Sequence, residues 1–207
     1  MKNIFSKKTK LYAIIDYNLC LKNNIDIFEF ARAYIKGGGG IIQYRDKENS
    51  IDKIKSNAFE LKNICDDNDA VLIINDYAEI ALELNLPVHL GQTEPLDMNK
   101  NLYWGFSTHN IEEVKYALKI NASYIGFGAM FKSKTKPDVI SSFNILEAAI
   151  KLWPKEIVLI GGINIENTTL LPSKANIFYA VISDFFRFGK RSDDIQKYTK
   201  DFIEKYR

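Results

Sequence analysis

The sequence predicts an α/β protein, a single-domain closed (β/α)8 TIM barrel spanning residues 1–207. Eight short apolar runs follow one another, and a helical pattern follows all of them except the fourth. The runs lack strict alternation of apolar and polar residues, which is typical of parallel strands buried on both faces. Polar residues gather where the runs end, as they do at the mouth of a barrel. An open, doubly wound sheet is the alternative that the same pattern allows.

The strands are predicted from their apolar runs, taken in chain order. They cover residues 11–16, 40–45, 71–74, 87–90, 102–106, 124–127, 157–160 and 177–182. The intervening helices are predicted from apolar residues at helical spacing. They cover residues 27–35, 51–65, 78–84, 110–119, 142–152, 165–171 and 195–203.

Several helix ends have their own signals. The glycines at 37–40 stop the first helix, and Ser50 is an N-cap for the helix whose apolar face begins at Ile51. Asn110 with Glu113 forms a variant of the capping box. Residues 128–140 are a polar loop rich in Lys, Ser and Thr, which we expect to act as a lid.

Composition bounds the function classes. Apolar residues make up 46% and charged residues 26% of the chain, as in ordinary soluble proteins, and the formal charge of +2 gives no sign of nucleic acid as a partner. No run is long enough to span a membrane. Residues 1–8 lack the apolar core of a signal peptide. The first ten or so residues are expected to be a flexible or capping extension of the barrel. Cys20 and Cys65 fit no metal spacing and suit a reducing cytoplasm.

The second strand carries the most informative polar residues. Gln43, Arg45 and Lys47 are spaced two apart, so in a strand they share one side. An amide, a guanidinium and an ammonium that converge at a strand end suit phosphate oxygens. The alternative is a strand whose polar tip simply reaches water.

The other strand ends add further polar groups. These are Asn75 and Asp76 after strand three, Glu94 after strand four, Ser107 after strand five, Ser133, Thr135 and Lys136 after strand six, Gly161 and Gly162 after strand seven, and Ile182 and Ser183 after strand eight. Glycines after strand seven and a small polar residue after strand eight suit a phosphate bound by backbone N–H groups, because a side chain at the glycines would hold the anion away from the backbone.

Asp76 and Glu94 are the carboxylates best suited to a divalent metal. Mg²⁺ is commonly bound by one or two carboxylates together with substrate phosphates. In the alternative, Asp76 is the N-cap of a helix that starts at Tyr77, and Glu94 is a solvated loop acid.

Together, the polar residues at the strand ends imply two anion subsites. One is a diphosphate site with Gln43, Arg45, Lys47, Lys136 and the metal, and the other is a monophosphate site at strands seven and eight.

These residues resemble the thiamine phosphate synthase family, a (β/α)8 family that also contains the TenI-type thiazole tautomerases. The likeness covers nearly the whole chain. It rests on Gln43-Tyr44-Arg45-Asp46-Lys47, Ile74-Asn75-Asp76, His89-Leu90-Gly91-Gln92, Ser107-Thr108-His109-Asn110, Phe127-Gly128 with Thr135-Lys136-Pro137, and Gly161-Gly162-Ile163.

The resemblance implies an Mg²⁺-dependent transferase that joins 4-amino-5-hydroxymethyl-2-methylpyrimidine diphosphate to hydroxyethylthiazole phosphate. The residues that would hold the pyrimidine diphosphate are Gln43, Arg45, Lys47, Asn75, Ser133, Thr135 and Lys136. Those that would hold the thiazole phosphate are Gly162, Ile182 and Ser183. Asp76 would bind Mg²⁺ and Ser107 would contact the pyrimidine; Arg45, Lys47, Lys136 and Ser107 are the expected catalytic residues.

Two departures from the family pattern matter. Thr93-Glu94 replaces the second metal-binding aspartate, and residues 171–176 lack the glycine usual before the last strand. The rival functions are a tautomerase that uses His109 as acid and base, and a non-catalytic phosphate-binding regulator. His89, inside a buried strand, is interpreted as a hydrogen-bonded core residue. The sequence leaves a homo-oligomer open.

Overall fold

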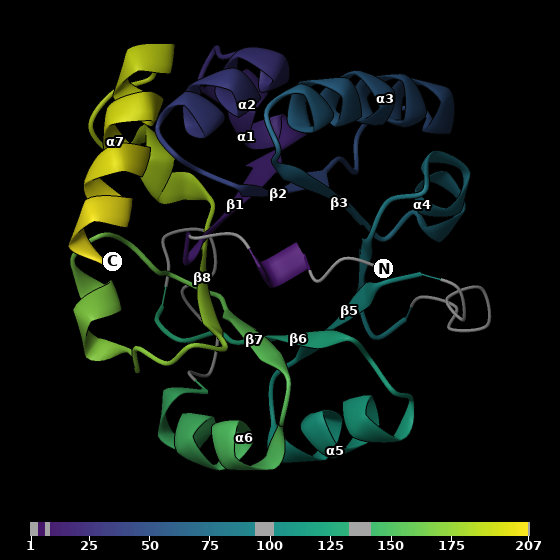
Figure 1. Ribbon diagram of the computed structural model, residues 1–207, viewed down its shortest axis with the longest axis vertical. Coiled ribbons are helices and arrows are strands. Elements are labelled where there is room, and N and C mark those ends of the chain that lie inside the picture. The colour runs from purple at the N-terminus through teal and green to yellow at the C-terminus, as the bar shows by residue number, and fades with distance from the viewer. Residues whose placement is uncertain (1–3, 7–8, 94–101, 133–141, 207) are drawn as a thin grey trace.

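The computed structural model describes residues 4–6, 9–93, 102–132 and 142–206. Within these ranges eight parallel strands close into a barrel, because β8 pairs with β1 through Leu11–Tyr179 and its neighbours. The closure confirms the (β/α)8 prediction, and the open-sheet alternative is wrong. Figure 1 shows the strands as an inner ring with the helices arranged outside it.

The strands and helices alternate along most of the chain. The strands are β1 (Leu11–Asp16), β2 (Ile41–Arg45), β3 (Val71–Asn75), β4 (Val88–Leu90), β5 (Trp104–Thr108), β6 (Tyr124–Phe127), β7 (Glu156–Leu159) and β8 (Ile177–Val181). The α-helices are α1 (Tyr17–Lys22), α2 (Ile27–Lys36), α3 (Ile51–Asp67), α4 (Ala78–Leu84), α5 (Ile111–Lys119), α6 (Leu146–Leu152) and α7 (Ser192–Lys205). The 3₁₀ helices are η1 (Ile4–Ser6), η3 (Phe143–Ile145), η4 (Asn167–Leu170) and η5 (Ser183–Phe186).

The predicted helix caps are confirmed. Ser50 Oγ accepts from Lys53 N at 3.4 Å, and Asn110 Oδ1 accepts from Glu113 N at 2.9 Å. Ile51, however, is 60% exposed, so its expected place on the inner face of α3 is wrong. It is the first residue of α3, and the buried face of that helix begins at Ile54.

Strand residues alternate between two apolar layers. The inner layer fills the barrel with Tyr12, Ile14, Ile41, Ile73, Tyr124, Val158, Phe178 and Ala180. The residues between them along the strands, such as Ile42, Tyr44, Ile74 and Leu159, pack in the outer layer against the helices. Both faces of the sheet are therefore buried, which explains the unbroken apolar runs.

A short N-terminal helix lies over one end of the barrel. Ile4 and Phe5 of η1 are buried in the inner layer, and the Phe5 ring contacts Tyr124 and Phe178 at centroid distances of 5.0 and 4.4 Å. Tyr124 is the first residue of β6, so η1 covers the amino-terminal end of the strands. In Figure 1 it lies at the centre of the ring.

Three elements differ from the predictions. A short helix, α1, follows β1 directly because Asp16 caps it by accepting from Leu19 N at 3.0 Å. The helix expected over residues 165–171 is only the 3₁₀ turn η4. The fifth strand runs two residues further than its apolar run and includes Ser107 and Thr108, whose hydroxyl groups bond to His89 and to the carbonyl of Gly126.

No helix in the described ranges is long and apolar enough to cross a bilayer.

Candidate active site

The carboxyl ends of the strands bring the predicted polar residues to one mouth of the barrel. Strand register sets Asp16 opposite Arg45, Asn75 opposite His89, and Ser107 opposite Gly126. Because these strands are parallel and neighbouring, the side chains that face the barrel axis converge above the inner apolar layer.

Arg45 is the last residue of β2 and forms an ion pair with Asp16 at the end of β1. Asp16 is held by a second contact, since its other oxygen caps α1 at Leu19 N. The Arg45 side chain is 39% exposed and that of Asp16 15% exposed. A guanidinium fixed in this way, and still open to solvent, can meet an incoming anion.

Lys47 lies in the loop after β2 and pairs with Asp76, the residue after β3, at 2.9 Å between Nζ and Oδ2. Asp76 is not the N-cap of α4, so that alternative is wrong: the cap position is Tyr77, which has no side-chain cap. Asp76 has a positive φ of 69°, and its N–H donates to the His89 carbonyl at 2.9 Å. Asp tolerates this conformation better than most residues, and it turns the carboxylate toward Lys47.

Asp46, between the two cations, has a structural role that the sequence alone did not reveal. Its carboxylate accepts from the Tyr44 hydroxyl at 2.6 Å, from Asn49 Nδ2 at 2.9 Å, and from the N–H groups of Glu48 and Asn49. Burial opposes its charge, but these hydrogen bonds together lower its pKa. Asp46 thereby orders the loop that carries Lys47.

Asn75, the last residue of β3, is 9% exposed. Its side-chain amide has no hydrogen-bond partner among the residues that the structure describes. Buried polar groups are nearly always paired, so this amide beside the cations is available to a ligand.

Gln43 and Ser107 lie deeper than the cations. Gln43 is 3% exposed, and its Nε2 donates to the Tyr12 hydroxyl at 2.9 Å. Ser107 Oγ is 3.0 Å from His89 Nε2, and the other nitrogen of that ring is 3.1 Å from the Tyr124 hydroxyl. Burial lowers the pKa of His89 to about 4, with Asp76 opposing the shift, so the imidazole is neutral near pH 7. His89 is a hydrogen-bonded interior residue, as expected.

The opposite side of the mouth contains glycines. Gly161 and Gly162 follow β7 with positive φ angles of 99° and 63°. A Cβ on Gly162 would lie 2.7 Å from the Lys132 carbonyl oxygen, so only glycine fits without a shift. Ile182 and Ser183 follow β8 directly, and η5 begins at Ser183. Gly161 and Gly162 bring no side chain to this part of the chain.

Four predicted residues, Glu94, Ser133, Thr135 and Lys136, lie outside the described residues. The segment that leads to Glu94 starts beside Asp76, since a Cβ on Gly91 would be 3.9 Å from Asp76 Oδ1. Within the described ranges no group of three His, Cys, Asp or Glu side chains could hold a metal. Of the two carboxylates expected to bind a metal, Asp76 and Glu94, Asp76 is the one that the structure describes.

His109 lies at the start of α5 and is engaged locally. Its N–H and its Nδ1 both contact Glu113 Oε2, at 2.6 and 2.9 Å. The side chain is 59% exposed. This geometry is that of a residue at a helix start with a local hydrogen bond.

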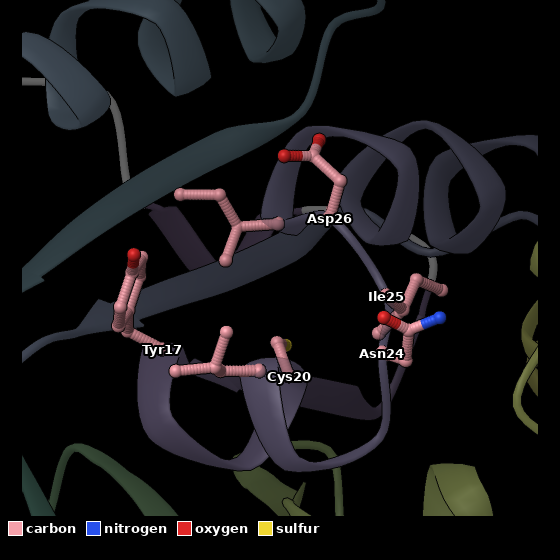
Figure 2. Close-up of a pocket in the computed structure, with 7 residues that line it drawn as sticks. Tyr17, Cys20, Asn24, Ile25 and Asp26 are labelled. Atoms are coloured by element: carbon pink, nitrogen blue, oxygen red, sulfur yellow. The ribbon is translucent and has the colours of Figure 1, made fainter.

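A separate cavity of about 250 Å³ lies between α1 and the start of α2. Figure 2 shows Tyr17, Cys20, Asn24, Ile25 and Asp26 around it. It has no lysine or arginine in its lining, and its carboxylate, Asp26, caps α2. It is not suited to a phosphate ligand.

Comparison with known proteins gives consistent relatives. The family model described as thiamine monophosphate synthase matches residues 11–185. The thiamine-phosphate synthase of Coprothermobacter proteolyticus is 34% identical over 88% of this chain and 89% of that protein, and the one of Persephonella marina is 33% identical over 95% and 96%. The solved thiamine phosphate pyrophosphorylase from Pyrococcus furiosus superposes with a TM-score of 0.83, at 27% identity over 99% of this chain and 98% of that one.

Proposed function

The chain belongs to the thiamine monophosphate synthase family, and we propose that it joins 4-amino-5-hydroxymethyl-2-methylpyrimidine diphosphate to hydroxyethylthiazole phosphate. The products are thiamine phosphate and pyrophosphate. The observation that carries the proposal is the pair of cations, Arg45 and Lys47, fixed by carboxylates at the mouth of the barrel. Fixed positive charges of this kind stabilise the negative charge that develops on a diphosphate leaving group.

The bond that breaks joins the pyrimidine methylene carbon to a diphosphate oxygen, and the electron pair leaves with pyrophosphate. The electron-rich aminopyrimidine stabilises the resulting cation. Arg45 and Lys47 bind the departing oxygens, and Asn75 offers to the same ligand an amide that has no hydrogen-bond partner within the described part of the chain. The thiazole nitrogen then donates its electron pair to the methylene carbon. No enzyme nucleophile is required, because positioning and electrostatics lower the barrier.

The thiazole phosphate is assigned to the opposite side of the mouth. Gly162, Ile182 and Ser183 offer backbone N–H groups without a bulky side chain at Gly162. A phosphate held there positions the thiazole ring between the two subsites. This arrangement suits a reaction in which a second substrate must attack a short-lived cation.

Mg²⁺ is proposed to bind at Asp76. One partly buried carboxylate beside a diphosphate is a donor set that Mg²⁺ accepts, with Glu94 as the further candidate ligand. Bound there, Mg²⁺ would neutralise charge on the pyrophosphate. Asp76 Oδ2 is occupied by Lys47, so metal binding and the release of Lys47 toward the diphosphate are expected to be coupled.

The test is a discontinuous assay with both substrates, with and without Mg²⁺, in which thiamine phosphate is oxidised to fluorescent thiochrome. We expect Mg²⁺-dependent product. A folded protein that makes none would contradict the proposal. Isomerisation of the thiazole phosphate carboxylate, abolished in His109→Ala, would then identify a tautomerase. Diphosphate binding without turnover would identify a regulator.

We infer a cytoplasmic enzyme with small-molecule phosphate substrates. Cys20 and Cys65 are free and buried, and burial raises the pKa of each thiol to about 12. Neither thiol is reactive in this state, which is consistent with a reducing compartment.

A further inference from the structure

A chain of hydrogen bonds crosses the barrel interior beneath the mouth. Gln43 Nε2 donates to Tyr12 at 2.9 Å, the hydroxyl groups of Tyr12 and Tyr124 are 3.2 Å apart, and Tyr124 is 3.1 Å from His89 Nδ1. His89 Nε2 is 3.0 Å from Ser107 Oγ. The chain thus links β2, β1, β6, β4 and β5 and ends at the serine in the candidate pyrimidine site.

The barrel makes room for this chain at two glycines. A Cβ on Gly105 would lie 2.1 Å from the Tyr124 ring, and a Cβ on Gly126 would lie 2.9 Å from the His89 ring. Phe5 of η1 packs on Tyr124 from the other end of the barrel. The two rings are therefore confined on several sides, which fixes the direction in which each polar atom points.

The donors and acceptors of the chain run in one direction. The amide nitrogen of Gln43 can only donate, so Tyr12 accepts from it. The Tyr12 hydrogen then finds its acceptor if it is directed to Tyr124, 3.2 Å away. Tyr124 then donates to His89 Nδ1, and a neutral imidazole carries its one hydrogen on the other nitrogen. His89 Nε2 consequently donates to Ser107 Oγ, which leaves the hydroxyl hydrogen of Ser107 without an acceptor in the described protein.

We propose that Gln43, Tyr12, Tyr124 and His89 form a one-way relay that makes the Ser107 hydroxyl a hydrogen-bond donor to a ring nitrogen of the aminopyrimidine. This role rests on the proposed function, because it requires the pyrimidine at Ser107. His89, Tyr124 and Tyr12 are positioning residues: they act on the substrate through the orientation of Ser107. A ring nitrogen of an aminopyrimidine has a lone pair and no hydrogen, so a directed donor distinguishes it from the exocyclic amine.

The direction of the relay can be measured without substrate. The chain has two histidines, so His109→Gln leaves His89 as the single one. In this protein labelled with ¹⁵N-histidine, at pH 7.5, we expect Nδ1 to resonate as an unprotonated ring nitrogen and Nε2 as a protonated one. A hydrogen on Nδ1 would overturn the proposal, because it would reverse every bond up to Ser107.

Two substitutions test the source of the direction. Gln43→Glu replaces the terminal donor by a carboxylate that accepts from Tyr12, and it should move the His89 hydrogen to Nδ1. Tyr124→Phe keeps the ring and removes one hydroxyl, so it should abolish the preference for Nε2–H. Unchanged His89 spectra in folded samples of both variants would contradict the relay.

The kinetic readout separates positioning from general stability. Tyr124→Phe should raise KM for the pyrimidine diphosphate about tenfold and leave KM for the thiazole phosphate unchanged. The matched control is Tyr34→Phe, which removes another buried hydroxyl, one that donates to the Leu11 carbonyl in the outer layer. Equal changes of KM in both variants would overturn the proposal.

An Nε2–H signal in a protein that makes no thiamine phosphate would refute the proposed function and leave the direction of the hydrogen-bond chain intact.

Discussion

The two sides of the barrel mouth present different chemistry. After β1 to β3 the proposed anion site consists of charged side chains, Arg45 and Lys47, each held by a carboxylate. After β7 and β8 the proposed phosphate site consists of backbone at Gly162, which has a positive φ angle, and at Ser183. The first arrangement can take up charge that develops during a reaction, whereas the second can hold a phosphate whose charge does not change. The difference suggests that catalysis and positioning are divided between the two sides.

The largest effect is expected at Arg45. Arg45→Ala should lower kcat about a thousandfold, because it removes charge stabilisation of the leaving pyrophosphate and leaves Asp16 without its partner. Arg32→Ala is the control, since Arg32 pairs with Glu60 on the surface at 3.8 Å and should leave turnover unchanged. Steady-state rates by the thiochrome assay measure both. Intact turnover in Arg45→Ala would refute the division of roles.

The second effect concerns His89, below the charged side of the mouth, and the stability of the protein at acidic pH. The pKa of His89 is about 4 in the fold, against about 6.5 in an unfolded chain. Between these pH values the unfolded state binds a proton that the native state does not. The contribution of His89 to the free energy of unfolding is therefore fully present above pH 6.5 and falls as the pH drops toward 4. The loss is on the order of 3 kcal/mol.

Urea unfolding at pH values from 7 to 4 measures this loss. In His89→Gln the free energy of unfolding should change less with pH over this range than in the unsubstituted protein. The groups facing His89 are Tyr124, which is neutral there because burial raises its pKa, and Asp76, which partly offsets the shift. His109→Gln is the control, and its free energy of unfolding should depend on pH as it does in the unsubstituted protein. The same slope in His89→Gln and the unsubstituted protein would assign the acid loss to carboxylates instead.

The third effect tests the backbone side. Gly162→Ala places a side chain at a φ of 63° and 2.7 Å from the Lys132 carbonyl oxygen. We expect KM for the thiazole phosphate to rise about tenfold or more, with KM for the pyrimidine diphosphate changed less than about twofold. Gly38→Ala is a matched control, because Gly38 also has a positive φ, 97°, but lies at the end of α2. If KM for both substrates rises equally in Gly162→Ala, the two subsites are not independent.

The same comparison explains which parts of the site the sequence could predict. Gln43 and Arg45 share one face of β2, as the strand period of two predicts, whereas Lys47 lies beyond the end of the strand, so its place was not set by that period. The barrel was found because its buried strands leave continuous apolar runs. Both signals are local along the chain.

What escaped prediction depends on contacts between distant segments. Asp16 and Arg45 are 29 residues apart, and Tyr12 and Tyr124 are 112 apart, so no spacing rule links them. Asp46 stood in the recognised motif, but its role depends on the Tyr44 and Asn49 side chains that surround it. Ser107 was expected after its strand because a polar residue is typical of a loop; in the barrel it is part of β5, where its hydroxyl oxygen bonds to His89.

The smallest effect is expected at Lys47, and it tests how the charged side is switched. Lys47 is 52% exposed, so Lys47→Met should change the free energy of unfolding by less than about 1 kcal/mol. The substitution removes one of the cations proposed to bind the diphosphate and also frees the Asp76 carboxylate from its ion pair. KM for the pyrimidine diphosphate should therefore rise about tenfold, while Mg²⁺ should bind the substrate-free protein more tightly, as measured by calorimetry. Lys55→Met, which breaks a surface pair with Glu83, should alter neither quantity. Weaker Mg²⁺ binding in Lys47→Met would show that lysine and metal do not compete for Asp76, and that the ion pair preorganises the metal site instead of closing it.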